Sequence, residues 1–211
     1  MFHPWEGGEG KVSGQYQLSR LEIAKAIIEE VEASEHTSDA SPASLTHAIQ
    51  LLEECLVFPH SLGEGKLYGA QDNDFYYYLG RAFEAKGREL KRNGQDYEAD
   101  RIFNKASKMY HLGTHGPTEP AAALYYNDAK PEKIFFAALC YRALGDEDKA
   151  CCLFHKLVNY GKQHYFDEVR MDYFAVSLPD LLVWDEDLNI RNRKHCEAMI
   201  ALGEKGLKGN S

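Results

Sequence analysis

The sequence lacks any long apolar run and any excess of positive charge. Nothing in its 211 residues approaches the roughly 18 apolar residues of a membrane-spanning helix, and no charged start precedes an apolar stretch. Neither a membrane span nor a signal peptide is therefore predicted. Lys and Arg number 24 against 33 Asp and Glu, which leaves a formal net charge of −9. Because phosphate neutralisation needs a concentrated basic face, a nucleic-acid partner is not expected.

Cysteines are few and follow no framework spacing. There are five, and none forms a Cys-x-x-Cys pair: Cys55, Cys140, Cys151, Cys152 and Cys196. An odd number without regular spacing predicts reduced thiols and a cytoplasmic location. Structural zinc needs four ligands in clustered pairs, so no metal site is predicted, and no cofactor-binding loop is recognised.

Strand-like alternation of useful length is also missing, and this absence predicts an all-α fold. Proline suits the first turn of a helix, as at Pro131, and Asp can cap one. Eight helices are expected, at about 15–34, 44–57, from a cap at Asp72 or Asp74 to 93, 96–110, 131–144, 147–161, 167–177 and 187–207.

Residues 131–160 carry the spacing of a closely packed helix pair. The pattern is small, aromatic, Gly, Ala, aromatic and apolar, at Ala138, Tyr141, Gly145, Ala150, Phe154 and Leu157. Small side chains at positions 138 and 150 let two helices approach closely, and Gly145 suits the left-handed turn after the first helix. The pattern resembles a tetratricopeptide repeat, a helix–turn–helix unit of about 34 residues that buries its apolar face by stacking on its neighbours.

Other segments match this pattern in part. A unit beginning at Asn73 has Gly80 and Ala99 at the crossing positions, but its second helix arrives about seven residues late, so both helices should be longer around Gly94. Units are expected at about 15–59, 73–110 and 131–161, with a partial unit at 187–207. The resemblance implies a single domain over residues 1–211, built as a right-handed array of antiparallel helix pairs.

A second resemblance comes from a repeated motif. The motif Gly-Glu-Gly-Lys-x-x-Gly occurs twice, once beginning within residues 3–11 and once within residues 62–74. Residues 172–188 contain a Ser-Leu-Pro-Asp run. Together they resemble the C-terminal repeat region of large bacterial proteins whose N-terminal half is an uncharacterised β-sandwich domain, thought to be similar to carbohydrate-active folds. The resemblance implies that this chain is a fragment of a longer protein.

The tetratricopeptide resemblance also implies a binding groove. In such arrays the concave wall comes from fixed positions of each first helix. Carried to this sequence, these positions are Asp74, Tyr77, Arg81, Glu84, Glu132, Phe135, Leu139 and Arg142. A wall of aromatic and Arg side chains suits a peptide or a packed domain. We therefore expect Tyr77, Arg81, Phe135 and Arg142 to be exposed on one continuous surface that contacts a protein, an adjacent domain of the same chain or a second copy.

The repeated motif invites a ligand-binding interpretation. A phosphate-binding P-loop is excluded, because no Ser or Thr follows either Lys and no strand precedes the motif. The glycines favour tight turns, but the charged residues between them also suit contact with a ligand or a neighbouring domain. Both interpretations stay open for Trp5, Glu9, Lys11, Glu64 and Lys66.

Other chemistry-bearing clusters have simpler explanations. His111 and His115 are separated by Gly113, which favours a loop over a helical metal site. An acidic run ending at Asp187 suits the start of a helix. No nucleophile–base pair is recognised, so the leading hypothesis is a non-catalytic scaffold. The alternative is an accessory region that completes a carbohydrate-processing site on an adjacent β-sandwich domain, because glycoside hydrolysis needs paired carboxylates.

Overall fold

The computed structural model describes residues 9–34, 42–63, 65–66, 70–122, 130–169 and 187–209, with the backbone alone for 9–12, 34, 42 and 43. These residues form α-helices and one short 3-10 helix, and they contain no strand, which confirms the all-α prediction. The helices are α1 (Glu9–Ser34), α2 (Pro42–Leu56), η1 (His60–Leu62), α3 (Asn73–Arg92), α4 (Asp96–Gly113), α5 (Pro131–Ala143), α6 (Glu147–His164) and α7 (Leu188–Leu207).

Most helix boundaries lie within a few residues of their predicted positions. The main differences are at α1, which begins at Glu9 rather than Gln15, and at α4 and α6, which each run three residues further than expected. The helix expected from Asp167 is not present at residues 167–169, and the rest of that segment lies outside the described residues.

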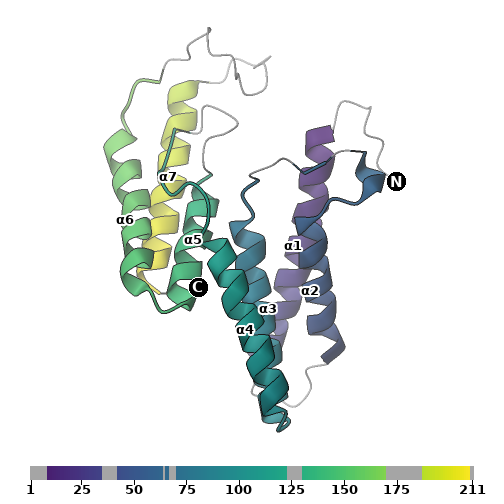
Figure 1. Cartoon of the computed structure of the whole chain (residues 1–211). Helices are drawn as coiled ribbons and strands as arrows, with labels where there is room; N and C mark the ends of the chain where they lie inside the picture. Colours follow the sequence, from purple (N-terminus) through teal and green to yellow (C-terminus); the bar gives the residue numbers. More distant parts are fainter. Residues whose placement is uncertain are drawn as a thin grey trace. The chain divides into compact units, whose positions relative to one another are not determined.

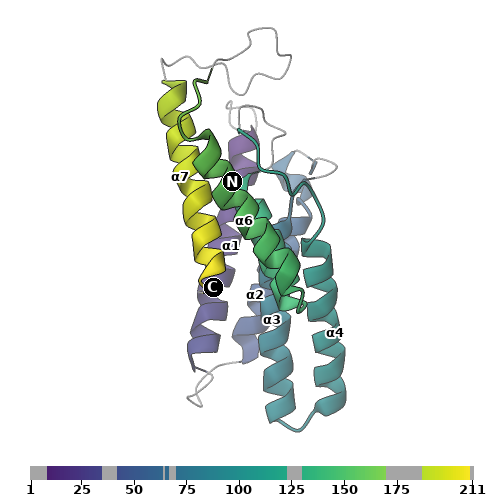
Figure 2. The same cartoon turned by 90° about the vertical axis from the view of Figure 1, so that its left-hand side faces the viewer.

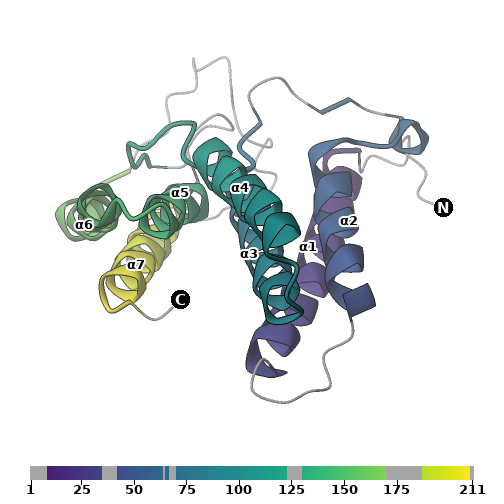
Figure 3. The ribbon, with the colours of Figure 1, turned by 60° about the horizontal axis from the view of Figure 1, so that its bottom comes forward.

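The chain divides into two compact units, Met1–Gly113 and Thr114–Ser211. In the first unit, α1 packs on α2, α2 on α3, and α3 on α4, while α1 also contacts α3 (Figures 1 and 3). In the second unit, α6 packs against both α5 and α7, and α5 contacts α7; Figure 2 shows α6 and α7 side by side. The first unit therefore holds two helix pairs, and the second holds one pair with a third helix.

The α3–α4 and α5–α6 pairs are closed by the same type of turn. Gly94 has φ +74° and Gly145 has φ +82°. In the first turn the amide of Gln95 donates to the Leu90 carbonyl at 3.0 Å, and in the second the amide of Asp146 donates to the Tyr141 carbonyl at 2.9 Å. These bonds satisfy carbonyls at the helix end while the glycine adopts the left-handed conformation. The predicted role of Gly145 is confirmed. Both helices around Gly94 were expected to be longer, but only α3 is, with 20 residues against 13 in α5, whereas α4 and α6 both have 18.

Small residues lie at the helix crossings of the first unit. Ala99 and Ala106 of α4 are buried. A Cβ added to Gly80 would meet the Tyr110 ring at 2.2 Å, and one added to Gly87 would meet the Phe103 ring at 2.7 Å. The two glycines of α3 thus leave room for two aromatic rings of α4.

The second unit also has small residues at its helix crossings, but at different positions of the repeat. Ala138 and Ala150 are fully buried at the α5–α6 crossing, as the repeat pattern predicts. On α7, a Cβ at Gly206 would meet the Phe154 ring at 2.3 Å, and a Cβ at Gly203 would meet the Phe154 carbonyl oxygen at 2.6 Å. Here α7 approaches α6 so closely that side chain and backbone are both in contact.

The aromatic positions of the pattern divide into two groups. Phe154 is fully buried and Phe83 is buried, as expected. The repeat pattern predicts that the rings of Phe83, Phe103, Tyr141 and Phe154 are all buried beside the helix crossings. This is wrong for Phe103 and Tyr141, which are only half-buried.

Candidate functional site

Two of the groove residues predicted on α3 are buried. Tyr77 is 7% exposed, so the expectation that it lies on an open surface is wrong. Its ring centroid lies 6.2 Å from that of Tyr110, because α4 is long enough to bring Tyr110 against it. Asp74 is also buried, and its Oδ1 accepts a hydrogen bond from the Phe75 amide at 3.0 Å.

Arg81, by contrast, joins α3 to α1. Its guanidinium donates to both carboxylate oxygens of Glu32, one of them from Nε at 3.3 Å. It also lies 5.8 Å from the Tyr77 ring centroid and 5.5 Å from that of Tyr78. Burial lowers the pKa of Arg81, but the hydrogen bonds to Glu32 and the neighbouring tyrosines raise it by more. The net shift of the pKa is upward, so the guanidinium group stays charged. Arg81 therefore works as a fixed cation between two helices.

Glu84 and Arg88 continue this network along α3. Arg88 lies 3.8 Å from Glu32 and 3.9 Å from Glu84, and the Tyr110 hydroxyl donates to Glu84 at 3.0 Å. On α1, the Lys25 ammonium lies 5.7 Å from the Tyr78 ring centroid. The side chains of the band are between 19% and 39% exposed. We name this band the α1–α3 face; its residues are Lys25, Glu32, Arg81, Glu84 and Arg88.

Two of the groove residues predicted on α5 are also buried. Phe135 is 4% exposed and Leu139 is 5% exposed, so the predicted exposure of Phe135 is wrong. The cause is the packing of α6 and α7: the Phe135 ring lies 5.6 Å from that of Phe154, and the Lys205 ammonium is 5.9 Å from its centroid. α7 thus covers the wall that the repeat pattern assigns to binding.

The other two residues predicted on α5 differ in their surroundings. Glu132 is exposed. Arg142 donates to the Gly206 carbonyl of α7 at 2.8 Å and to the Glu147 carboxylate at 2.6 Å. Four of the eight predicted residues belong to the first unit and four to the second. Within its own unit, Arg142 joins α5 to α7 and to the start of α6.

The repeated motif is described in part. Trp5 and Glu64 lie outside the described residues, and for Glu9 and Lys11 only the α1 backbone is described. The second copy ends in Lys66, whose ammonium donates to the carbonyls of Cys55 at 3.0 Å and Leu56 at 3.4 Å. It also pairs with Asp72 at 2.6 Å, with both side chains about 15% exposed or less.

The contacts of Lys66 favour the structural interpretation of its loop. The two carbonyls belong to the end of α2, where backbone acceptors have no partner within the helix and where a positive charge is favourable. Lys66 thus ties the loop to the last turn of α2 and, through Asp72, to the residue before α3. A ligand that needed this ammonium would have to replace all three partners.

Sequence reasoning missed Lys25, Glu32 and Arg88, which complete the α1–α3 face. A seven-residue spacing places two helical residues on one side, so Arg81 indicates Arg88, and Lys25 indicates Glu32. The pairing of α1 with α3 itself left no local signal in the sequence.

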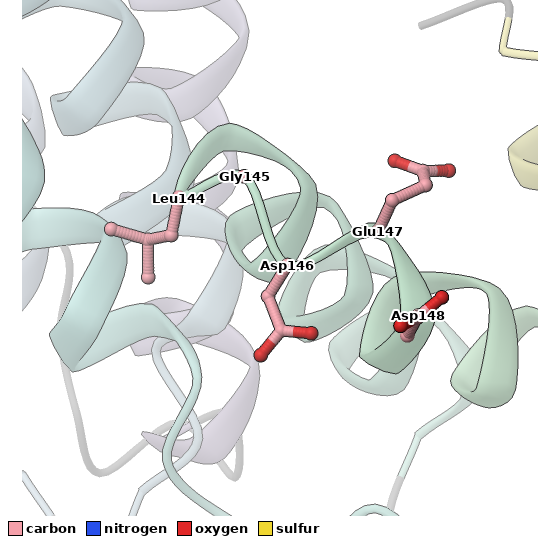
Figure 4. A pocket seen from close by; sticks show the side chains of 5 residues that line it. All are labelled: Leu144, Gly145, Asp146, Glu147 and Asp148. Carbon is pink, nitrogen blue, oxygen red and sulfur yellow. The ribbon is translucent and has the colours of Figure 1, made fainter.

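A shallow depression of about 340 Å³ lies at the α5–α6 turn (Figure 4), lined by Leu144, Gly145, Asp146, Glu147 and Asp148. Its three carboxylates point in different directions, and two of them, Asp146 and Glu147, are engaged in hydrogen bonds. Asp146 accepts from the Lys149 amide at 3.2 Å and caps α6, while hydrogen bonds from Arg142 and then Cys151 lower the pKa of Glu147 to about 2. Among the described residues no group of three or more His, Cys, Asp or Glu could hold a metal ion.

The remaining sequence candidates have structural positions. His111 lies in α4, which ends at Gly113, and His115 follows the helix, so the two do not share one helical face. The acidic run lies outside the described residues except for Asp187, which caps α7 by accepting from the Asn189 amide at 2.8 Å. This favours the helix-start interpretation at Asp187.

No known protein family matches this chain, and no solved structure matches it either. Within the described residues, no helix is both long enough and apolar enough to cross a membrane. The described helices define an all-α protein that contains packed helix pairs.

Proposed function

We propose that this chain is a non-catalytic scaffold of tetratricopeptide-like helix pairs that docks a protein partner or an adjacent domain. The observation that carries the proposal is the contact between α1 and α3, the first helices of consecutive pairs, which together present the α1–α3 face. In helical-repeat proteins, corresponding helices of successive units line the binding surface. The right-handed sense of the array belongs to this proposal.

The chemistry of the α1–α3 face suits an extended peptide. Arg81 and Arg88 offer planar guanidinium groups, which bind carboxylates and peptide carbonyls through several donors at once. Arg81 is fixed by Glu32 and by two tyrosine rings, so little side-chain freedom is lost when a partner binds. Glu32 and Glu84 lie beside the arginines, and we expect a partner that carries both acidic and basic side chains.

A cytoplasmic location and the absence of catalytic activity are parts of the same proposal. Cys55, Cys140 and Cys196 are buried free thiols, and Cys151 and Cys152 are also free, which supports a reducing, cytoplasmic setting. The carbohydrate-processing alternative depends on Trp5, Glu9 and Glu64, whose side chains are not among those described. It stays a prediction without a supporting contact.

The test is a selected peptide ligand. Short peptides are selected from a random display library on the immobilised chain, and the dissociation constant of the best one is measured by calorimetry. Arg88→Ala should weaken binding by roughly tenfold or more, because an interfacial arginine is a common anchor. Arg101→Ala, at an exposed position on α4, is the matched control and should leave binding within about twofold.

Two outcomes would contradict the proposal. One is the failure of the library to give any peptide that binds. The other is a peptide that binds equally well to the two variants, which would place its site away from the α1–α3 face. Tyr77→Ala is not used, because removing a buried ring would confuse loss of binding with loss of folding.

A further inference from the structure

The two arginines of the α1–α3 face converge on one carboxylate. Nε of Arg81 lies 3.3 Å and Nη2 of Arg88 lies 3.8 Å from the same atom, Oε1 of Glu32. The other oxygen of Glu32 accepts a hydrogen bond from Nη2 of Arg81. Two guanidinium groups from α3 therefore meet at a single negative charge that α1 supplies.

Arg81 contacts Glu32 through only one edge of its guanidinium group. Its two hydrogen bonds to Glu32 start from Nε and Nη2, which form the side edge of the planar fork. The third nitrogen, Nη1, donates no hydrogen bond to any residue that the structure describes. The end edge, made of Nη1 and the second N–H of Nη2, thus still has donors for another acceptor. Two parallel N–H groups on such an edge match the two oxygens of a carboxylate.

The acceptors of the same face are already engaged. Both oxygens of Glu32 accept from Arg81, and Oε2 of Glu84 accepts from the Tyr110 hydroxyl at 3.0 Å. The side chain of Arg88 is the most exposed on the face, at 39%. What the face offers to a partner is therefore mainly hydrogen-bond donors, and the partner has to supply the acceptor.

A carboxylate suits these donors better than a backbone carbonyl does. Hydrogen bonds between two charged groups are roughly twice as strong as those between neutral groups, and a carboxylate can accept from both N–H groups of one edge. The side chain of Arg81 is only 19% exposed, so its charge is screened less than that of an exposed arginine. The chemistry of the arginine pair thus favours an acidic side chain.

We propose that an Asp or Glu side chain of the partner binds between Arg81 and Arg88, beside Glu32. This carboxylate accepts from the end edge of Arg81 and from Arg88, so that two carboxylates and two guanidinium groups alternate in one cluster. The inference rests on the proposed function, since it names the group by which the docked segment is held at the α1–α3 face. Arg81 is held in place by Glu32 and lies beside the rings of Tyr77 and Tyr78 before the partner arrives.

The test is a double-mutant cycle between the chain and the selected peptide, made with an amidated C-terminus so that its only carboxylates are side chains. Each acidic residue of the peptide is changed in turn to its amide, and dissociation constants are measured by calorimetry. One of these changes should weaken binding to the unmodified chain roughly tenfold or more. With Arg88→Ala the same change should have a much smaller effect, because the carboxylate has already lost a partner. With the control Arg101→Ala it should keep its full effect.

Lysine substitutions separate the charge of each arginine from its planar fork. Arg81→Lys and Arg88→Lys keep the positive charge but lose the edge that holds two carboxylate oxygens at once. Each should weaken binding of the unmodified peptide roughly tenfold and bind the amide variant about as well as the unmodified chain does. Circular dichroism and urea denaturation check the fold of both variants. Arg88→Lys leaves the hydrogen bonds between Arg81 and Glu32 in place, so it gives the comparison even if Arg81→Lys is unstable.

Two results would overturn this inference and leave the proposed function intact. One is a peptide that needs Arg88 for binding but contains no acidic residue. The other is an acidic residue whose change to the amide has the same effect in the unmodified chain and in Arg88→Ala. By contrast, a peptide whose affinity does not depend on Arg88 would contradict the proposed function itself.

Discussion

The α3–α4 and α5–α6 pairs are closed by the same type of turn, but they differ in where small residues leave space for aromatic rings. In α3–α4, the glycines lie within the pair, at Gly80 and Gly87, and the rings of the partner helix fill the space. In α5–α6, the crossing uses alanines, and the glycines lie on the next helix, α7, against Phe154. The same spacing of small and large residues can thus serve contacts within a pair or between a pair and its neighbour.

The difference has a consequence for the surfaces. In the first unit, Glu32 of α1 pairs with Arg81 and Arg88 of α3, and this leaves a band of charged side chains partly exposed. In the second unit α7 approaches closely enough to bury Phe135 and Leu139. We therefore expect the first unit to bind partners through its first helices and the second unit to have this face closed.

The largest predicted effect is at Gly203. Alanine there would place its Cβ 2.6 Å from the Phe154 carbonyl oxygen, which belongs to the backbone and cannot rotate away. We expect Gly203→Ala to lower the free energy of unfolding by about 2–3 kcal/mol. Gly14→Ala is the control, since that helical position is open and alanine should stabilise it by about 0.5–1 kcal/mol. Denaturation by urea measures both, and equal effects would refute the close α6–α7 contact.

The corresponding change in the first unit, Gly80→Ala, should lower the free energy of unfolding by less, and removing the Tyr110 ring should abolish the effect. Gly80→Ala would meet the Tyr110 ring, which is a side chain and can be removed. We expect a loss of about 1–2 kcal/mol in the unmodified background. In a Tyr110→Ala background the same change should have almost no effect. A double-mutant cycle with no coupling between the two positions would show that the ring does not occupy the space beside Gly80.

The glycines also show which parts of the structure could be predicted from the sequence. Helix ends were predictable, because Gly94, Gly145 and Pro131 act locally through backbone conformation. The burial of Tyr77 was not, because it depends on the extra length of α4, which brings Tyr110 over the α3 wall. The partial unit at 187–207 places Gly203 at the position that Gly145 has in its own unit and so predicts a turn, but Gly203 lies inside α7 at a helix crossing. Repeat spacing alone does not say which neighbour a glycine faces.

A third prediction concerns the loop between the two pairs of the first unit. Lys66→Met keeps the length of the side chain but removes its charge, so the carbonyls of Cys55 and Leu56 and the carboxylate of Asp72 lose their shared partner. We expect a loss of about 1–2 kcal/mol in urea denaturation. Lys86→Met, at an exposed bond to Thr46, should change stability by less than about 0.5 kcal/mol. If the two variants are equally stable, Lys66 is free for another role.

The smallest predicted effect is a pH dependence in the second unit. Because hydrogen bonds from Arg142 and Cys151 lower the pKa of Glu147 from an ordinary value of 4.5 to about 2, this carboxylate stabilises the fold fully above about pH 4.5. The contribution is lost as the pH falls through about 2. The difference in melting temperature between the unmodified chain and Glu147→Gln should therefore shrink on acidification. A difference that stays constant from neutral pH to pH 2 would mean that the Arg142–Glu147 pair is absent in solution.

The most direct test of the account is to locate a bound partner. Hydrogen–deuterium exchange is measured on the chain with and without the selected peptide, and backbone amides are followed in each helix. We predict slower exchange in the parts of α1 and α3 that carry the α1–α3 face, with α4 and α5 unchanged. Protection of α5 or α4 without protection of α1 and α3 would contradict the claim that the first unit binds through its first helices.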